Sequence, residues 1–305
     1  MSVLVVGSIA LDTVKTPVEE HCDLLGGSAC YAALGASFFS SVRLVGIVGD
    51  DFPESEFRFW KSRKIDSDGV QRVNGKTFRW SGEYSWDLNT RETRSIALNV
   101  FEHFKPVLPE AYRQTDFVLL ANIAPSLQSH VLDQMERPRF VVADTMDLWI
   151  ETTRKDLDAL LPRIDLLILN DSEAREMTKD TSLIRAGRSI RRMGPKYVAV
   201  KKGEHGALLF GPDDFFSCGA YPLEDIHDPT GAGDTFAGGL AGYLAGQGVE
   251  EVDFGLLRRA VIFGSVLASF NVEAFSLERL RRLTMEEIEE RYKMFRVMSQ
   301  FEVLP

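Results

Sequence analysis

The sequence lacks the features that mark secreted and membrane-embedded proteins. It contains only three cysteines, Cys22, Cys30 and Cys218, among 305 residues. Their spacing fits neither a disulfide framework nor a metal site, which favours free thiols in a reducing compartment. The N-terminal apolar run has no basic segment before it, so we expect no signal peptide. No apolar run reaches the length of a membrane span. We therefore expect a cytoplasmic protein without a membrane partner.

Basic charge is also scarce. The chain has 35 Lys and Arg residues against 45 Asp and Glu residues, a formal net charge of −10, and no basic block. Binding to a phosphate backbone depends on clustered Lys and Arg side chains, so we expect no nucleic-acid partner. An anionic ligand would need local positive charge.

Several common catalytic motifs are missing from the sequence. There is no G-x-x-x-x-G-K-[ST] loop, no H-E-x-x-H pair and no G-x-S-x-G elbow. The string "GAGDTF" has Phe236 where the dinucleotide fingerprint requires a third glycine. These absences argue against a P-loop protein, a zinc protease and a dinucleotide-binding enzyme.

Short apolar runs recur along the chain, and most of them end in Gly, Asp or Asn. They read "VLVVG", "VRLVGIVG", "DFVLLAN", "FVVAD", "IDLLILN" and "YVAVKKG". Such runs, separated by helical patterns, predict an α/β fold with a parallel sheet buried on both faces and a helix after each strand. Ligands bind beyond the carboxyl ends of such strands. Near the C-terminus, Thr284 and Glu287 form a capping-box pattern that predicts a helix start.

One stretch has a different period. From Phe78 to Leu88 apolar and polar residues alternate, which predicts a half-exposed antiparallel strand. Asn74-Gly75 is a hairpin signal before it, and "NTRET" is a candidate turn after it. We predict a small antiparallel sheet over residues 70–103 that acts as a flap over the site. The alternative is that its aromatic residues simply cover the core.

The stretch "DPTGAGDTFAGG", residues 228–239, contains the strongest chemical signal. Its glycines precede a run of small and apolar residues that predicts a helix, and a helix N-terminus favours an anion. The amide groups of Gly231, Ala232 and Gly233 would face a phosphoryl group. The carboxylate of Asp234 would then take a proton from the attacking hydroxyl, as phosphoryl transfer requires.

This stretch resembles the second signature of the PfkB, or ribokinase-like, family of carbohydrate and nucleoside kinases, and it meets every position of that signature. Further elements resemble the family in the same order over about residues 1–282. They are "GSIALD", "GGSACYAALGAS" (the first signature), "VGIVGDDF", "LNDSEARE" (the N-x-x-E element) and "KKGEHGALLF" (the nucleotide turn, usually T-x-G-x-x-G).

The resemblance implies a fold and a set of roles. The implied fold is a three-layer α/β/α domain over residues 1–305, with a mostly parallel central sheet and a small antiparallel β lid from residues 12–25 and 70–103. The implied cofactors are ATP and Mg²⁺, with a monovalent cation such as K⁺ as a further candidate. The implied site residues are Asp234, Gly231, Ala232 and Gly233 for catalysis, Asn170, Lys201, Gly203, Gly206 and Thr230 for ATP, Asp12, Gly26 and Gly27 for the acceptor, Glu173 for Mg²⁺ through water, and Asp228 for a monovalent cation.

Two positions depart from the family pattern. Tyr31 stands where the first signature normally has Asn, so the support of the acceptor site differs. Lys201 stands where Thr is common in the nucleotide turn. Lys201 would either contact phosphate or point to solvent, and the sequence leaves both open. Three residues also have purely structural alternatives: Asp12 as a turn residue, and Glu173 and Asp234 as ordinary acids at helix starts.

The expected function is ATP-dependent phosphorylation of a hydroxyl on a small sugar or polyol. A nucleoside is the alternative acceptor, because the aromatic side chains of the flap could stack on a base. A ligand-binding regulator that has lost turnover is a further alternative. The projecting sheet would have a free edge, so a homodimer through the lid is an expected partner arrangement.

Overall fold

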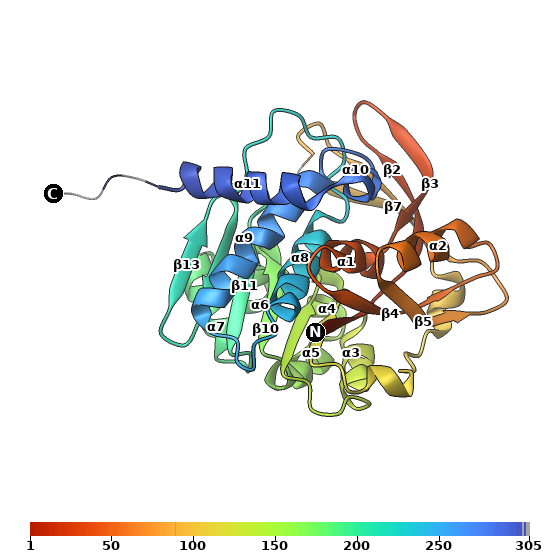
Figure 1. Cartoon of the computed structure of the whole chain (residues 1–305), viewed down its shortest axis with the longest axis horizontal. Helices are drawn as coiled ribbons and strands as arrows, with labels where there is room; N and C mark the ends of the chain where they lie inside the picture. The colour runs from red at the N-terminus through yellow and green to blue at the C-terminus, as the bar shows by residue number, and fades with distance from the viewer. Residues whose placement is uncertain (89, 301, 303–305) are drawn as a thin grey trace.

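The computed structural model describes residues 1–88, 90–300 and 302, and its largest element is a central sheet between two layers of helices (Figure 1). Within these residues nine strands form the sheet, in the order β13-β12-β11-β10-β9-β8-β1-β4-β5. They are β1 (Ser2–Val6), β4 (Ser41–Val48), β5 (Ile65–Arg72), β8 (Phe117–Leu120), β9 (Phe140–Asp144), β10 (Leu166–Asn170), β11 (Tyr197–Lys201), β12 (Ala207–Phe210) and β13 (Phe215–Cys218). Neighbouring strands pair in parallel, except that β12 is antiparallel to β11 and β13.

Both faces of the inner strands of this sheet are buried, which explains why those strands are apolar, whereas the edge strands β5 and β13 are partly exposed. In β1 the side chains of Val3 and Val5 join one apolar cluster, and those of Leu4 and Val6 join the other. The first cluster is covered by α1 (Ser28–Ser37), α2 (Glu54–Ser62), α8 (Ala232–Gly246), α9 (Phe254–Asn271), α10 (Glu278–Arg282) and α11 (Met285–Met298). The second is covered by α3 (Pro125–Leu132), α4 (Asp147–Thr152), α5 (Arg154–Leu160), α6 (Asp171–Thr178) and α7 (Leu183–Arg191).

The six apolar runs of the sequence become β1, β4, β8, β9, β10 and β11, so the predicted parallel sheet is confirmed. The expectation that a helix follows each run is wrong for β11, which continues into the antiparallel β12. Strand β1 lies between β4 and β8. From β1 the chain adds β4 and β5 on one side of the sheet, and it then returns to add β8 and the later strands on the other side. Ligands bind at the carboxyl edge near such a switch point.

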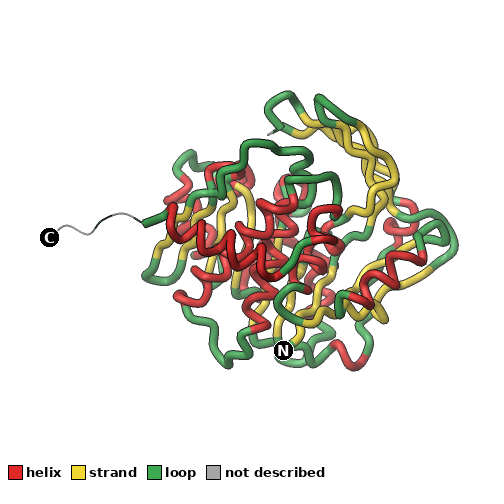
Figure 2. Tube along the Cα trace, turned by 45° about the horizontal axis from the view of Figure 1, so that its top comes forward, coloured by secondary structure: helices red, strands yellow, loops and turns green. Residues whose placement is uncertain are grey.

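A second sheet stands apart from the central one, and it is the predicted lid (Figure 2). In the described chain it has four strands in the order β3-β2-β6-β7, namely β2 (Ala10–Lys15), β3 (Glu20–Gly26), β6 (Phe78–Tyr84) and β7 (Arg91–Ala97). The predicted small antiparallel lid is confirmed for two of its three strand pairs, whereas β2 and β6 pair in parallel. These two strands come from distant parts of the chain, so no hairpin fixes their direction.

The limits of the second lid segment also differ from the prediction. The lid begins at Phe78, because residues 70–72 belong to β5 of the central sheet, and residues 99–103 form a 3₁₀ helix. Asn74-Gly75 is not a lid hairpin, since it connects β5 to β6. The alternation ends at Tyr84, and Trp86 lies in the following turn with 87% of its surface exposed. Of the predicted turn "NTRET", Asn89 lies outside the described residues.

Two further expectations concern the thiols and the C-terminus. All three cysteines are free thiols, as predicted. Thr284 and Glu287 form the predicted capping box at the start of α11, because each side chain accepts a hydrogen bond from the other residue's amide group. None of the helices in the described part of the chain combines the length and hydropathy that a bilayer span requires.

The two helices that carry the family signatures, α1 and α8, pack against each other through small residues. A Cβ atom on Gly238 of α8 would lie 2.1 Å from the carbonyl oxygen of Ala32 in α1. This close approach brings the N-terminal ends of both helices to the same edge of the sheet.

We expect Gly238→Ala to lower the free energy of unfolding by about 1–3 kcal/mol, because an overpacked site must force two backbones apart. The matched control is Gly255→Ala in the first turn of α9, an exposed position where the nearest side-chain atom to a new Cβ is Asp253 Oδ1 at 3.3 Å. The control should change stability by less than about 1 kcal/mol. Urea denaturation of the three proteins measures both, and equal stabilities would mean that the α1–α8 contact is loose.

Candidate active site

The turn before α8 depends on a glycine that packs against an aromatic ring. Gly231 caps α8 with φ of 75°, in the left-handed region. A Cβ atom at this position would lie 2.4 Å from the ring of Tyr31, which is buried beneath the turn. Tyr31, the departure from the first signature, therefore supports the turn from below. Asn271 at the end of α9 also stabilises the turn. Its side-chain amide donates to the carbonyl of Thr230 (2.8 Å), and its Oδ1 atom accepts from the hydroxyl of Thr235 (3.1 Å).

The turn presents amide donors, although fewer than the sequence suggested. The amide of Ala232 donates to the carbonyl of Pro229 (3.2 Å), so it is already engaged. Among the described residues, the amides of Gly231 and Gly233 meet no acceptor. These two donors lie at the positive end of a 15-residue helix, where an anion is stabilised.

Asp234 is the third residue of α8 and is half-buried beside these donors. Burial of its carboxyl group raises its pKa to about 7, and the nearby Asp144 carboxylate contributes to that rise. The cations Lys201 and Arg91 oppose it. The charges of one cation from the central sheet and one from the lid thus both act on Asp234, and its proton affinity suits acid–base chemistry near neutral pH.

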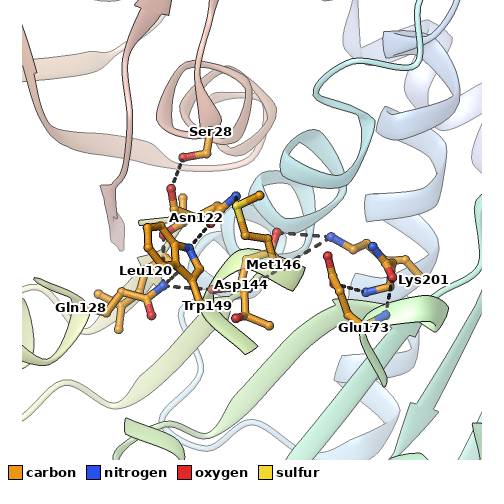
Figure 3. Close-up of polar contacts among 12 residues, drawn as sticks. Ser28, Leu120, Asn122, Gln128, Asp144, Met146, Trp149, Glu173 and Lys201 are labelled. Carbon is orange, nitrogen blue, oxygen red and sulfur yellow. Dashed lines mark hydrogen bonds and ion pairs between the residues drawn. The ribbon is translucent and has the colours of Figure 1, made fainter. Parts of the chain in front are cut away.

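Lys201 ends β11 and points toward the glycine turn, so the alternative in which it points to solvent is wrong. Its Nζ atom lies 3.2 and 3.4 Å from the two oxygens of Asp144, the last residue of β9 (Figure 3). A Cβ atom on Gly233 would lie 2.9 Å from this Nζ atom. Burial alone would lower the pKa of Lys201, but the carboxylates of Asp144, Glu173 and Asp234 together raise it. Lys201 therefore carries its charge directly in front of the turn.

Asn170 and Glu173 form a capping box at the start of α6. The Asn170 amide donates to Glu173 Oε2 (2.6 Å), and the Glu173 amide donates to Asn170 Oδ1 (2.8 Å). Both residues of the N-x-x-E element thus have a structural role that the sequence pattern alone already indicates. Glu173 is also buried, and burial raises its pKa to about 7 while the charge of Lys201 opposes the rise. Its carboxyl group faces the same space as Lys201 and Asp144 (Figure 3).

The nucleotide turn is shaped by two glycines with positive φ. Gly203 has φ of 55°, and a Cβ atom there would meet nothing within 4 Å, so its surroundings are open. Gly206 has φ of 87°, and a Cβ atom there would lie 2.1 Å from the carbonyl oxygen of Cys218. The turn therefore packs tightly against the end of β13 and is open beside Lys201.

Asp12 lies on the lid strand β2, inside the predicted lid segment, so the alternative in which it is a turn residue is wrong. Its buried carboxylate accepts a hydrogen bond from the amide of Gly27, whereas its Oδ1 atom has no partner within the described residues. A Cβ atom on Gly26 would lie 1.9 Å from Oδ2 of Asp12, so the carboxylate occupies the space of a side chain. Burial raises the pKa of Asp12 to about 7, and the carboxylates of Asp228 and Asp234 contribute to that rise.

Asp228 is fully buried below the turn. Its Oδ1 accepts from the amide of Thr230 (2.8 Å), and its Oδ2 accepts from the amide of Ser276 (3.1 Å). Thr230 in turn bonds the hydroxyl of Tyr84 on β6 through its own hydroxyl (3.1 Å). This bond joins the lid directly to the glycine turn.

The structure thus brings together residues from all the predicted motifs except "VGIVGDDF", and it adds three residues that the sequence did not identify. Asp144 and Asn122 are the last residues of two of the apolar runs, "FVVAD" and "DFVLLAN". Because ligands bind beyond the carboxyl ends of such strands, this position was the sequence signal that could have identified them. Asn122 anchors the indole N–H of Trp149 through Oδ1 (2.8 Å), and its carbonyl accepts from Ser28 (Figure 3). Arg91 gave no sequence signal, because its place depends on the lid.

The fold and sequence are similar to those of known kinases. A model described as "pfkB family carbohydrate kinase" matches residues 3–279. A cytidine kinase from Thermococcus kodakarensis is 31% identical over 267 residues, which cover 85% of this chain and 94% of that protein. A nucleoside kinase from Methanothermobacter thermautotrophicus is 27% identical over 266 residues, covering 85% and 82%. The structure of Arabidopsis thaliana ribokinase complexed with ribose and ATP has a TM-score of 0.74, 23% identity and coverage of 95% and 98%. The predicted ribokinase-like fold is confirmed.

We expect Lys201→Met to lower stability by about 3–5 kcal/mol at pH 8, because it leaves the buried Asp144 without its cation. Burial already raises the pKa of Asp144 despite Lys201, and losing the cation raises it further. A raised carboxyl pKa destabilises the fold as pH rises above the unfolded value, so the deficit should be larger at pH 8 than at pH 5. Urea denaturation at both pH values measures it.

The double variant Lys201→Met with Asp144→Asn should recover most of the loss, since residue 144 then carries no charge that needs a cation. An equal loss at both pH values, with no recovery in the double variant, would contradict an electrostatic role for the pair.

Proposed function

Because the chain belongs to the pfkB family of carbohydrate kinases, we propose that it transfers the γ-phosphoryl group of ATP to a hydroxyl of a sugar moiety. The acceptor is either a free sugar or polyol, or the pentose of a nucleoside. The observation that carries the proposal has two parts. Asp234 lies beside two amides of the α8 turn that meet no acceptor among the described residues, and its charge acts on the buried carboxylate of Asp12 on the lid.

In this proposal the acceptor hydroxyl lies between Asp12 and Asp234. The unpartnered Oδ1 of Asp12 accepts a hydrogen bond from an acceptor hydroxyl, which removes the cost of a buried carboxylate oxygen without a donor. Asp234 accepts the proton of the attacking hydroxyl as its oxygen bonds to phosphorus and the bond to ADP breaks. The amides of Gly231 and Gly233 donate hydrogen bonds to the oxygens of the phosphoryl group in the transition state of the transfer.

The phosphates of ATP are proposed to lie between this turn and Lys201, with Gly203 and Gly206 shaping the loop and Thr230 bordering it. The base would lie beside α9, near residues 260–270. Lys201 is supported as a phosphate contact by its position against Gly233 and by its charge. A lysine acts on phosphate as a point charge and needs no fixed orientation.

Glu173 is proposed to hold Mg²⁺ through water, together with the phosphates of ATP. The described residues contain no group of three or more acidic, His or Cys side chains that could hold a metal alone. This fits Mg²⁺, which usually binds through one or two carboxylates, waters and substrate phosphates. When bound, the ion neutralises phosphate charge. Asn170 contributes by fixing the position of Glu173 through the capping box.

Two smaller parts of the proposal concern Asp228 and the lid. Asp228 is a candidate ligand for a monovalent cation such as K⁺, because it is a buried carboxylate whose hydrogen bonds come from neutral amides. Strand β7 is exposed along its whole length and lies at the edge of the lid sheet, which supports a homodimer through the lid. A regulator without turnover is disfavoured, since it would not need Asp234.

We expect Asp234→Asn to lower kcat by roughly 10²- to 10⁴-fold while ATP affinity changes little, because a general base is lost but the amide donors remain. The wild-type rate should rise with pH through about 7, where the carboxyl group ionises, and the variant should lack this limb. Asp171→Asn is the control, since Asp171 is also an acid in the first turn of a helix but pairs with Arg175 at the surface. Retention of more than about a tenth of wild-type kcat would refute the assignment.

We expect Glu173→Gln to raise the Mg²⁺ concentration needed for half-maximal activity, with a smaller change in acceptor KM. Glutamine can preserve the capping box, so α6 should keep its stability and only the charge is lost. Glu287→Gln provides the control, because Glu287 occupies the same position in the capping box of α11, away from the site. An unchanged Mg²⁺ titration would mean that Glu173 is only a capping residue.

A further inference from the structure

The inner face of the lid can be identified from its strand register. Asp12 pairs with Trp80, Gly82 with Thr93, and Tyr84 with Arg91. Paired residues on neighbouring strands project to the same face, and so do alternate residues of one strand. Asp12 and Tyr84 both reach the site, through Gly27 and Thr230 respectively. Trp80, Thr93 and Arg91 therefore also lie on the face that looks toward the site.

Trp80 is held in one position on this face. A Cβ atom on Gly82 would lie 2.0 and 2.2 Å from Cη2 and Cζ2 of the Trp80 ring, so the ring covers the space left by the missing side chain. The indole N–H donates to Thr93 Oγ1 on the neighbouring strand (3.2 Å). The side chain is nevertheless only half-buried. An aromatic ring is thus fixed in place while part of its surface stays accessible.

Arg91 lies next to this ring. Its guanidinium carbon is 5.4 Å from the centroid of Trp80, and its charge favours ionised Asp12 and Asp234. Among the described residues the Arg91 side chain makes no hydrogen bond and no ion pair. Arg94 on the same strand differs, because its Nε donates to Glu83 (2.7 Å), a carboxylate that also pairs with Lys15 (2.9 Å). The donors of Arg91 remain available to a ligand.

We propose that Trp80 and Arg91 recognise a nucleobase, so that the acceptor is a nucleoside and not a free sugar or polyol. This inference rests on the proposed kinase function of the same site. Trp80 would stack on the planar ring, and Arg91 would donate to a carbonyl oxygen or ring nitrogen at its edge. A free polyol presents hydroxyl groups on all sides and gains little from an aromatic ring and an unpaired guanidinium.

The spacing of the lid strands supports this assignment. Trp80 is the register partner of Asp12, and neighbouring strands lie about 4.8 Å apart. A pentose bound through its hydroxyls to Asp12 therefore places an attached ring next to Trp80. One small molecule can make both contacts only if it joins a pentose to a planar ring. The relatives named as cytidine and nucleoside kinases agree with this chemistry.

The first test is binding, measured by tryptophan fluorescence of the full-length enzyme titrated with cytidine, adenosine and ribose. The chain has four tryptophans, and stacking on Trp80 should quench part of the signal on addition of a nucleoside but not of ribose. Trp80→Leu should abolish this quenching. Trp86→Leu is the matched control, because Trp86 lies in the exposed turn after the same strand, and it should leave the quenching unchanged.

The second test is the acceptor KM under saturating MgATP. Trp80→Leu should raise the nucleoside KM roughly 10- to 100-fold, the usual effect of losing a stacking partner, while Trp80→Phe retains most of the affinity. Arg91→Met should also raise this KM, whereas Arg94→Met should not. The value of kcat should change little in Trp80→Leu, Trp80→Phe and Arg94→Met, because neither Trp80 nor Arg94 touches the transferred phosphoryl group. Arg91→Met also removes a cation that lowers the pKa of Asp234, so it should in addition move the rising limb of the kcat–pH profile to higher pH.

The outcomes separate the inference from the function on which it rests. Absence of phosphorylation of any nucleoside, sugar or polyol by the wild-type enzyme would refute the proposed function itself. A wild-type enzyme that prefers ribose or a polyol, with a KM unaffected by Trp80→Leu, would overturn the nucleobase site and leave the kinase intact. A large loss of melting temperature in Trp80→Leu with unchanged nucleoside KM would assign Trp80 a purely structural role.

Discussion

The attraction of the Asp234 carboxylate to two cations, Lys201 and Arg91, is the interaction on which the rest of the site depends. Buried carboxylates are costly unless charges or donors compensate them, and this site gathers acids from β2, β9, α6 and α8. Lys201 supplies positive charge from the central sheet, and Arg91 supplies it from the lid. The compensation is therefore shared between two sheets, and it is complete only where the lid lies over the helix end. In the proposed function, the same arrangement would separate a phosphate side from an acceptor side.

The second constraint is that a side chain must lie directly against the backbone, and a glycine permits this at three positions. Gly231 leaves room for the ring of Tyr31, Gly26 for the carboxylate of Asp12, and Gly82 for the ring of Trp80. In each case the side chain of another residue fills the space where a Cβ atom would be. These glycines therefore position the three neighbouring side chains by having no side chain of their own. At each position a Cβ atom would displace the neighbouring ring or carboxylate.

The lid is joined to the main fold by polar contacts as well as by its strands. The hydroxyl of Tyr84 meets Thr230 of the glycine turn, and Ser276 beside Asp228 donates to the carbonyl of Leu25 at the end of β3. Both contacts reach the two loops that surround Asp228. A change in the glycine turn would thus act directly on the lid through these two hydrogen bonds.

The sequence by itself determined the central sheet, the helix that begins at the glycine turn, and Asp234 as its acid. Each of these follows from local chemistry: apolar runs suit strands buried on both faces, and glycines before an apolar helix make an anion site. The parallel pairing of β2 with β6, the Lys201–Asp144 ion pair and the position of Arg91 were decided only by the tertiary structure. They depend on which distant segments meet, and no local pattern records that. The alternation around Trp80 predicted a strand correctly, but only its register with Asp12 showed which face meets the site.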